Sequence, residues 1–181
     1  MFEYIVYRQS YTLSCMFYVV MGVSGTGKST IGKLLSDRTG WNFYDADDFH
    51  PITNIVKMKR GIALTDEDRL PWLQKLEQLI TRHLQSDRPG ILACSALKSN
   101  YRQILRNNRS EVVFIYLRGD YNCIQNRLLQ RTGHFMSSNL LRSQFDTLEE
   151  PEGAVVIDVS LTREEIVEEI LKRINYNSRT D

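Results

Sequence analysis

The sequence predicts an α/β fold, a three-layer sandwich in which helices cover both faces of a five-stranded parallel sheet. Five short apolar runs alternate with helical patterns along the chain, as expected for strands joined by helical crossovers. A glycine-rich turn directly follows the first run and opens the first helix. The chain has 181 residues, which suits one domain with its own core. Right-handed crossovers then give a doubly wound sheet.

Each predicted element has its own local signal. The strands are rich in β-branched and aromatic residues, and they span residues 17–21, 41–44, 91–94, 112–117 and 154–159. The helices follow apolar periodicity, and they cover residues 28–38, 51–60, 65–85, 100–106, 121–131, 140–148 and 162–174. Gly40 and Gly61 are placed to end the first two helices, and Thr65 is a suitable N-cap for the third. Pro71 marks either a break in that third helix or its true first residue.

Residues 1–15 differ from the rest because they mix polar and apolar residues without a period. We expect a poorly ordered N-terminal extension there, followed by one domain over residues 16–181. Glu3 and Arg8 interrupt any apolar region of a signal peptide, while a transit peptide stays open as an alternative. Met16 begins the first strand pattern and is a candidate natural start.

Composition excludes several functional classes. Lys and Arg total 23 and Asp and Glu total 22, so the net charge of +1 gives no general basic field for nucleic acid or membranes. No apolar run reaches the roughly 20 residues of a membrane helix. Cys15, Cys94 and Cys123 form neither a disulfide framework nor a metal pattern, which favours a reducing compartment. We therefore expect neither nucleic-acid nor membrane partners.

The segment Gly22-Val-Ser-Gly-Thr-Gly-Lys-Ser29 matches the P-loop motif G-x-x-x-x-G-K-[ST] in its strand–turn–helix context. Its glycines let successive amides point at phosphate oxygens, and the helix adds its positive end. Lys28 is placed to reach the β- and γ-phosphates, and the Ser29 hydroxyl to ligate Mg²⁺. Gly32 is interpreted as a helix–sheet contact. The predicted nucleotide ligands in this segment are Gly22, Ser24, Gly25, Thr26, Gly27, Lys28, Ser29 and Thr30.

A P-loop alone indicates nucleotide binding and leaves the reaction open. A GTPase needs an N/T-K-x-D segment, which the sequence lacks, and a large ATPase module needs a longer chain. We therefore expect a small kinase that moves the γ-phosphoryl group of ATP to a small acceptor. A nucleotide-binding regulator without catalysis is the alternative from another class.

Acidic residues follow the second strand, at the crevice where doubly wound sheets bind ligands. Asp45 and Asp47 are two residues apart and point the same way if the extended geometry continues. Carboxylates near a nucleotide can hold hydrated Mg²⁺ or accept a proton from an attacking hydroxyl, and we assign Asp45 to the water shell of the ion. An ordinary solvated turn is the alternative for Asp45 and Asp47. His50 either bonds the substrate or orders the loop, and His83, which lies among leucines, is interpreted as structural.

Basic residues supply the other candidates. Arg69 is either a surface ion-pair partner or a guanidinium fork for an anionic acceptor. Lys98 and Arg102 follow the third strand and open onto the same crevice, with a surface role as the alternative. Arg127 and Arg131 share a helical face beside an expected lid over residues 127–140. We assign Arg127 to the nucleotide and Arg131 to the transferring phosphoryl group, the alternative being two solvated charges.

Many ordered motifs together resemble the gluconokinases of the small P-loop type over about residues 17–175. They are Gly22-Val-Ser-Gly-Thr-Gly-Lys-Ser-Thr30, Phe43-Tyr-Asp-Ala-Asp-Asp48, His50-Pro51, Lys57-Met58, Leu64-Thr-Asp-Glu-Asp-Arg69, Pro71-Trp72-Leu73, Cys94-Ser-Ala-Leu-Lys98, Tyr101-Arg102, Gly133-His-Phe-Met136 and Ser143-Gln-Phe145 with Leu148-Glu149. The sequence departs from the family pattern at Ser137, where proline is frequent.

The resemblance implies ATP-dependent phosphorylation of D-gluconate at its 6-hydroxyl, giving 6-phospho-D-gluconate. It also implies the shikimate-kinase-like and adenylate-kinase-like sandwich with strand order 2-3-1-4-5, a cytoplasmic location and a homodimer. By resemblance, Asp47 orients the acceptor hydroxyl and takes its proton, and Arg69 clamps the gluconate carboxylate. Gln144 lies opposite the lid and contacts the acceptor. Kinases of another small hydroxy acid such as shikimate, or of a nucleoside monophosphate, are the enzyme alternatives.

Overall fold

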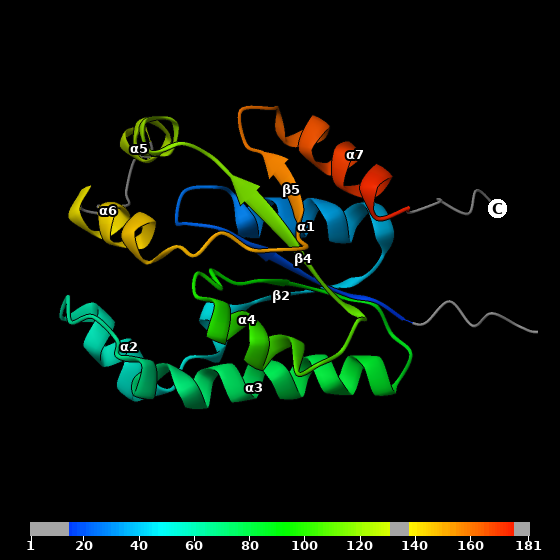
Figure 1. The fold of residues 1–181 in the computed structure, drawn as a ribbon, viewed down its shortest axis with the longest axis horizontal. Coiled ribbons are helices and arrows are strands. Elements are labelled where there is room, and N and C mark those ends of the chain that lie inside the picture. Colours follow the sequence, from blue (N-terminus) through cyan, green and yellow to red (C-terminus); the bar gives the residue numbers. More distant parts are fainter. Residues whose placement is uncertain (1–14, 131–137, 176–181) are drawn as a thin grey trace, which may run out of the picture.

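Five parallel strands form one sheet in the order β2-β3-β1-β4-β5, as the resemblance implied (Figure 1). The computed structural model describes residues 15–130 and 138–175. The strands are β1 (Phe17–Met21), β2 (Asn42–Asp45), β3 (Gly90–Ala93), β4 (Val112–Arg118) and β5 (Val155–Asp158). The helices are α1 (Lys28–Thr39), η1 (Ala46–Phe49, a 3₁₀ turn), α2 (Ile52–Lys59), α3 (Asp66–Gln85), α4 (Ser99–Arg106), α5 (Tyr121–Leu129), α6 (Ser138–Thr147) and α7 (Arg163–Arg173).

The central strand β1 is buried on both faces of the sheet, and its side chains alternate between two cores. Phe17, Val19 and Met21 point into the core beneath α3 and α4, whereas Tyr18 and Val20 point into the core beneath α1 and α7. All five are at most 6% exposed. A parallel strand covered by helices on both sides reads as a continuous apolar run, which is how this segment reads in the sequence.

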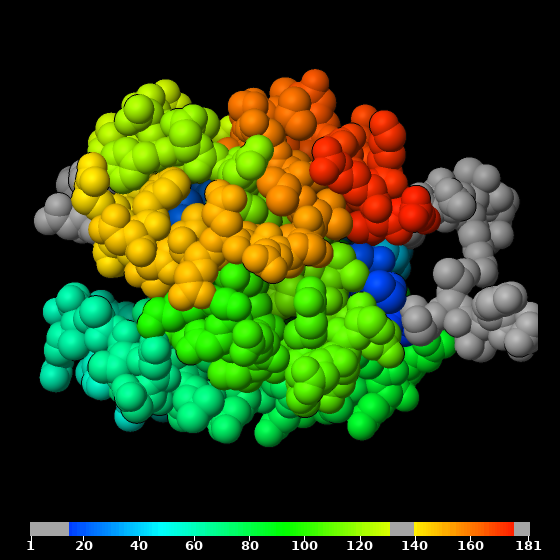
Figure 2. All heavy atoms as spheres, viewed as in Figure 1, coloured from blue at the N-terminus to red at the C-terminus, as the bar shows by residue number. Residues whose placement is uncertain are grey.

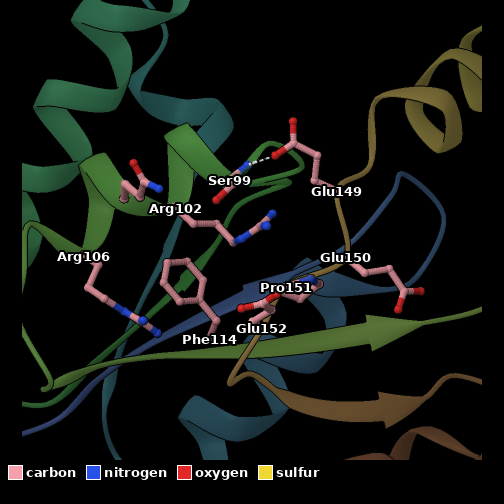
Figure 3. Close-up of a pocket in the computed structure, with 9 residues that line it drawn as sticks. Ser99, Arg102, Arg106, Phe114, Glu149, Glu150, Pro151 and Glu152 are labelled. Atoms are coloured by element: carbon pink, nitrogen blue, oxygen red, sulfur yellow. Dashed lines mark hydrogen bonds between the residues drawn. The ribbon is translucent and has the colours of Figure 1, made fainter.

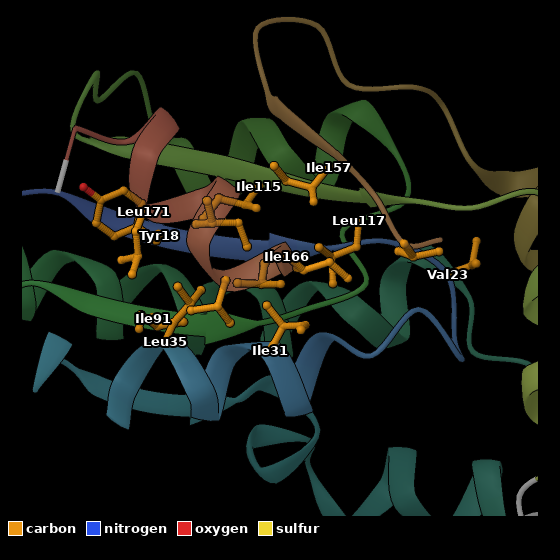
Figure 4. Packing of buried hydrophobic residues seen from close by; sticks show 14 of the residues in the cluster. Tyr18, Val23, Ile31, Leu35, Ile91, Ile115, Leu117, Ile157, Ile166 and Leu171 are labelled. Carbon is orange, nitrogen blue, oxygen red and sulfur yellow. The ribbon is translucent and has the colours of Figure 1, made fainter. Parts of the chain in front are cut away.

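The core beneath α1 and α7 is built from aliphatic side chains (Figure 4). Ile31 and Leu35 of α1 lie one turn apart and meet the sheet near Ile91. Ile166 and Leu171 close the same core from α7. This packing places the first turn of α1 at the carboxyl end of β1.

The opposite face of the sheet is covered by α3 and α4. Leu73, Leu76 and Ile80 form an apolar stripe on α3, and Leu105 adds to it from α4. The stripe follows the helical period predicted from the sequence. It fixes the first turns of both helices near the end of the sheet where β2 and β3 finish.

Helix α3 begins at Asp66 and runs through Pro71, which settles the alternative left open by the sequence. The Thr65 hydroxyl accepts a hydrogen bond from the Asp68 amide, and the Asp68 carboxylate accepts one from the Thr65 amide. This capping box satisfies amides that are otherwise free at a helix start. Proline is tolerated at residue 71 because it removes only one bond close to that end.

Two residues that we did not assign to chemistry are structural. A Cβ placed on Gly32 would lie 2.4 Å from the Phe43 ring, so glycine lets α1 approach β2. His83 is buried, with Nε2 2.9 Å from the Tyr44 hydroxyl and Nδ1 3.1 Å from the Arg88 carbonyl oxygen. Both findings confirm the sequence interpretation.

In the described part of the chain, no helix has the length and apolar character needed to cross a bilayer. The expected N-terminal extension falls almost entirely on residues outside the described ranges, as does the segment 131–137 of the expected lid. The extension and the lid therefore stay predictions.

Candidate active site

The P-loop connects β1 to α1 and depends on glycine where its backbone turns. Gly25 has a φ of +90°, a conformation that other residues rarely adopt. A Cβ there would also lie 2.9 Å from Ile124 and from Leu128 of α5. The Thr26 hydroxyl donates to the Val23 carbonyl oxygen at 2.9 Å and holds the turn. The loop therefore has the fixed curvature that points amides at phosphate oxygens.

Lys28 and Ser29 stand at the start of α1. The Lys28 ammonium donates to the Val23 carbonyl oxygen at 2.9 Å. The Ser29 hydroxyl donates to Oδ2 of Asp45 at 2.6 Å, which joins the P-loop to the carboxyl end of β2. A hydroxyl and a carboxylate side by side form the hard oxygen donor set that Mg²⁺ prefers, so this pair fits the ion.

Gln144 contacts the P-loop from α6. Its Oε1 accepts a hydrogen bond from the Ser24 amide at 2.6 Å, across 120 residues of sequence. The contact brings α6 against the loop that is predicted to bind the phosphates. The family resemblance implied an acceptor contact for Gln144, which stays a prediction; the structure shows its contact with the P-loop.

The acidic cluster does not continue the extended geometry of β2. Asp45 is the last residue of β2 and caps η1, because its Oδ1 accepts from the Asp47 amide at 3.2 Å. The chain turns at Ala46, so the premise that alternation alone aligns Asp45 with Asp47 is wrong. Short polar side chains such as Asp compete for backbone donors and favour such turns.

The two carboxylates nevertheless act on one another. Asp47 is an exposed residue of η1, but partial desolvation and then the Asp45 charge raise its pKa above the ordinary value. His50 and Lys28 lower the pKa of Asp47 in opposition. A carboxyl whose pKa is raised beside a phosphate-binding loop is suited to accept a proton.

Trp72 anchors the turn that carries Asp47, and the sequence analysis did not assign it a role. Its indole Nε1 donates to the Ala46 carbonyl oxygen at 2.7 Å. Its ring also stacks on His50, with ring centres 4.4 Å apart and planes 11° from parallel. The available signal was its position three residues after Arg69, on the same face of the helix.

The His50 ring is held in this stack, and its Nδ1 is available for a further hydrogen bond. Within the described residues, its Nδ1 is buried and has no hydrogen-bond partner. Burial is the main cause that lowers the pKa of His50, and Arg69 adds to it, while Asp47 opposes. The neutral ring is thereby favoured, so His50 can exchange a hydrogen bond without carrying charge.

Asp66 gathers a set of basic and phenolic groups at the start of α3. The Lys98 ammonium lies 2.7 and 2.8 Å from its two oxygens, and the Tyr101 hydroxyl donates to it at 2.5 Å. The hydrogen bonds from Lys98 and from Tyr101 lower the pKa of Asp66. The Arg69 guanidinium lies 6.0 Å from the centre of the Tyr101 ring, so Arg69 and Lys98 share one neighbourhood. Asp66 and Tyr101 were missed because ion pairs between distant segments leave no local pattern.

A second ion pair ties α2 to α3. The Lys57 ammonium lies 2.7 Å from Oδ1 of Asp68, and the Asn54 side-chain amide donates to the Asp68 carbonyl oxygen at 2.7 Å. The pKa of Asp68 is lowered first by its bond to Lys57. These contacts therefore fix the position of the short helix α2 relative to the start of α3, where Arg69 lies.

The other predicted basic residues lie elsewhere. Arg102 donates from Nη1 to the carbonyl oxygens of Ala96 and Leu97, at 3.0 and 2.9 Å, and is buried. Arg127 donates to the Val159 carbonyl oxygen between β5 and α7. Arg131 lies outside the described residues. The roles proposed for these three side chains stay predictions.

The surface is hollowed near the elements that carry the described site residues (Figure 2). In this view α2, in cyan, and α6, in yellow, face each other across a notch. Blue atoms of the segment around the P-loop lie at the bottom of a depression beside α5 and α6. The arrangement offers a phosphate side at the P-loop and an acceptor side at η1 and the start of α3.

Comparisons with known proteins agree on one group. The family model described as shikimate kinase matches residues 24–175. A "Probable gluconokinase" of Mus musculus is 42% identical over 86% of this chain and 96% of its own length. A "Gluconokinase" of Arabidopsis thaliana is 44% identical over 86% of this chain and 90% of its own. A crystal structure described as a gluconokinase from Sinorhizobium meliloti 1021 superposes with a TM-score of 0.78 at 39% identity, covering 92% of this chain and 99% of that one.

Proposed function

The chain belongs to the gluconokinase family, and we propose that it transfers the terminal phosphoryl group of ATP to the 6-hydroxyl of D-gluconate. The observation that carries this proposal is the Ser29–Asp45 contact of 2.6 Å. It places the phosphate loop directly beside the turn that bears Asp47. The curated relatives named above supply the choice of acid.

On the phosphate side, this chain provides amides and one ammonium. The P-loop amides and Lys28 bind the phosphates, and the positive end of α1 adds to their attraction. Because the loop is already curved and packed under α5, little reorganisation accompanies binding. Lys28 exchanges its bond to Val23 for a phosphate oxygen.

Mg²⁺ fits the pair formed by Ser29 and Asp45. When bound, the ion would neutralise charge on the transferring phosphoryl group. Ser29 is the direct ligand in this proposal, and Asp45 holds the water shell of the ion. Both oxygens are already positioned by their mutual hydrogen bond.

On the acceptor side, Asp47 orients the 6-hydroxyl and takes its proton as the phosphoryl group leaves ATP. The raised pKa of Asp47 supports this role because the carboxylate binds a proton more readily than an ordinary aspartate. His50, with its buried Nδ1, bonds a neighbouring sugar hydroxyl. Trp72 keeps the two groups at a fixed separation.

Arg69 binds the gluconate carboxylate, and Lys98 bonds the carboxylate or a hydroxyl next to it. Their shared neighbourhood around Asp66 and Tyr101 supports this assignment. Gln144 turns its amide nitrogen toward the acceptor while its oxygen holds Ser24. Arg127, Arg131 and the lid close over the nucleotide in this proposal, and Arg102 stays an alternative sugar ligand.

The test is ADP release from the purified full-length chain with a panel of acceptors, with Mg²⁺ added and withheld. We expect turnover with D-gluconate, little with shikimate or nucleoside monophosphates, and loss without Mg²⁺. Faster turnover with shikimate would transfer the proposal to that acid. ATP consumption that never responds to any acceptor would indicate a nucleotide-binding regulator instead.

We also propose a cytoplasmic homodimer, which the family resemblance implies. Three exposed apolar side chains on α2, Ile52, Val56 and Met58, support an interface. Light scattering after gel filtration gives the mass directly. A monomeric mass at micromolar concentration would remove the dimer from the proposal.

A further inference from the structure

A cavity of about 430 Å³ lies between α4 and residues 149–152, the segment that leads from α6 to β5 (Figure 3). Among the residues assigned above to nucleotide or acceptor, only Arg102 lines it. Small-molecule sites commonly have volumes of roughly 300–1,000 Å³. The cavity is therefore large enough for a ligand of its own.

Arg102 provides a fixed cation on one side of this cavity. Its side chain is only 9% exposed, although it carries a charge. Its Nη1 is held by the carbonyl oxygens of Ala96 and Leu97, which sets the plane of the guanidinium. Both of these bonds use Nη1, and Arg102 is among the residues that line the cavity. An oriented guanidinium binds carboxylate or phosphate in a bidentate manner.

Arg106 provides a second cation one turn further along α4. Within the described residues, its Nε is buried and has no hydrogen-bond partner. Its guanidinium lies 5.3 Å from the centre of the Phe114 ring, whose face favours a cation. Arg106 also lines the cavity, so the terminal nitrogens of its guanidinium are the donors that an anion there can use.

The acidic residues of the rim define what else the ligand must carry. Glu149 is already occupied, because its Oε2 accepts from the Ser99 amide at 2.6 Å. Glu150 and Glu152 line the same cavity, and Figure 3 shows the Glu150 side chain directed away from both arginines. Carboxylates at a rim repel polyanions but accept hydrogen bonds from hydroxyl groups. A single anionic head with a hydroxylated body matches both features.

We propose that this cavity binds a small polyhydroxylated anion, with its anionic head on the guanidinium of Arg106, its hydroxyl groups toward Glu152, and the charge of Arg102 adding attraction from the other side of the Phe114 ring. Figure 3 shows the two arginines extending from α4 on either side of the Phe114 ring. A sugar acid and a sugar phosphate share this chemistry. The test of this proposal is independent of phosphoryl transfer, because it measures binding and requires no turnover.

Calorimetric titration of the full chain with D-glycerate and with glycerol 3-phosphate tests the proposal and separates the two kinds of head group. We expect saturable binding of at least one probe. Arg106→Gln should weaken that binding about tenfold or more, since bonds to charged groups are the stronger ones. Arg163→Gln, which removes an exposed arginine at the start of α7, is the matched control and should change it less than about twofold.

Arg106→Lys keeps the charge without the fork, and it should also weaken binding, which guards against a folding defect in the glutamine variant. Thermal unfolding checks that each variant is folded. No saturable heat with either probe would overturn the proposal. So would equal affinity in wild-type protein and both Arg106 variants, because the probe would then bind elsewhere.

Discussion

The phosphate side and the acceptor side of the site are built in different ways. The phosphate side is one continuous segment, from Gly22 to Ser29, whose shape comes from its own glycines and from the helix that follows. The acceptor side is assembled from four separate elements, namely η1, α2, α3 and the start of α4. Contacts between these elements, such as those of Trp72 with Ala46 and of Lys98 with Asp66, hold them together.

The two sides should therefore differ in which substitutions disturb their geometry. A local loop keeps its shape as long as its glycines and its strand remain. An assembled site loses its geometry when one of the contacts that join its elements is removed, even if every side chain that binds substrate is still present. Replacing a side chain that binds substrate or nucleotide should therefore reduce activity on either side. Replacing a side chain that joins two elements should reduce activity only where it lies on the acceptor side.

The largest effect is expected for Asp47→Asn. Loss of the proton acceptor should reduce kcat by about 10²–10⁴-fold. Because the pKa of Asp47 is raised in the folded state, the folded protein binds this proton more tightly than the unfolded chain. Stability then falls as pH rises above the ordinary pKa of aspartate. The asparagine variant should lack that fall and melt no lower than wild type at neutral pH, and full activity would remove Asp47 from the acceptor site.

Lys28→Ala tests the phosphate side and should reduce kcat/KM by about 10²–10³-fold, as for loss of one oriented donor at a transferring group. The chain should remain folded because the loop is held by its glycines and by Thr26. ADP release measures the loss, and circular dichroism is the control. An active variant would contradict the placement of the triphosphate.

Arg69→Ala should raise the KM for gluconate by about tenfold or more and change the KM for ATP by less than about twofold. Arg82→Ala, an exposed arginine near the other end of α3, is the matched control. Initial rates with one substrate varied at a time separate the two constants. A larger change in the KM for ATP would assign Arg69 to the nucleotide.

Trp72→Phe removes the hydrogen bond between α3 and η1 and keeps every side chain that is proposed to bind substrate. The Ala46 carbonyl oxygen loses its donor, so the variant should be less stable by about 1–3 kcal/mol. Its kcat should fall several-fold because Asp47 and His50 are no longer fixed. Trp41→Phe is the comparison, since Trp41 stacks on Tyr18 in the other core. Equal kcat in both variants would show that the turn keeps its shape unaided.

The smallest effect comes from two matched helix caps. Thr65→Ala and Thr162→Ala each remove the hydroxyl of a capping box and should each cost about 0.5–2 kcal/mol in unfolding free energy. Only the first lies beside Asp68 and its partner Lys57. We expect a modest rise in the KM for gluconate for Thr65→Ala alone. Equal KM values would mean that the cap does not position α3.

The same contrast explains how much could be predicted from the sequence. Strand and helix positions and the P-loop followed from local patterns, because apolar period and glycine act over a few residues. The strand order required the family resemblance. Asp66, Tyr101 and Trp72 were not found, since their partners are 24 or more residues away. The 3₁₀ turn at Ala46 was missed because a capping aspartate and an extended one look alike in sequence.

The contact between Gln144 and the Ser24 amide has a consequence for selectivity. The Ser24 amide of the P-loop already has an acceptor oxygen at 2.6 Å, so stray anions find fewer unsatisfied donors there. An incoming ligand that needs this amide must displace a side chain borne by α6.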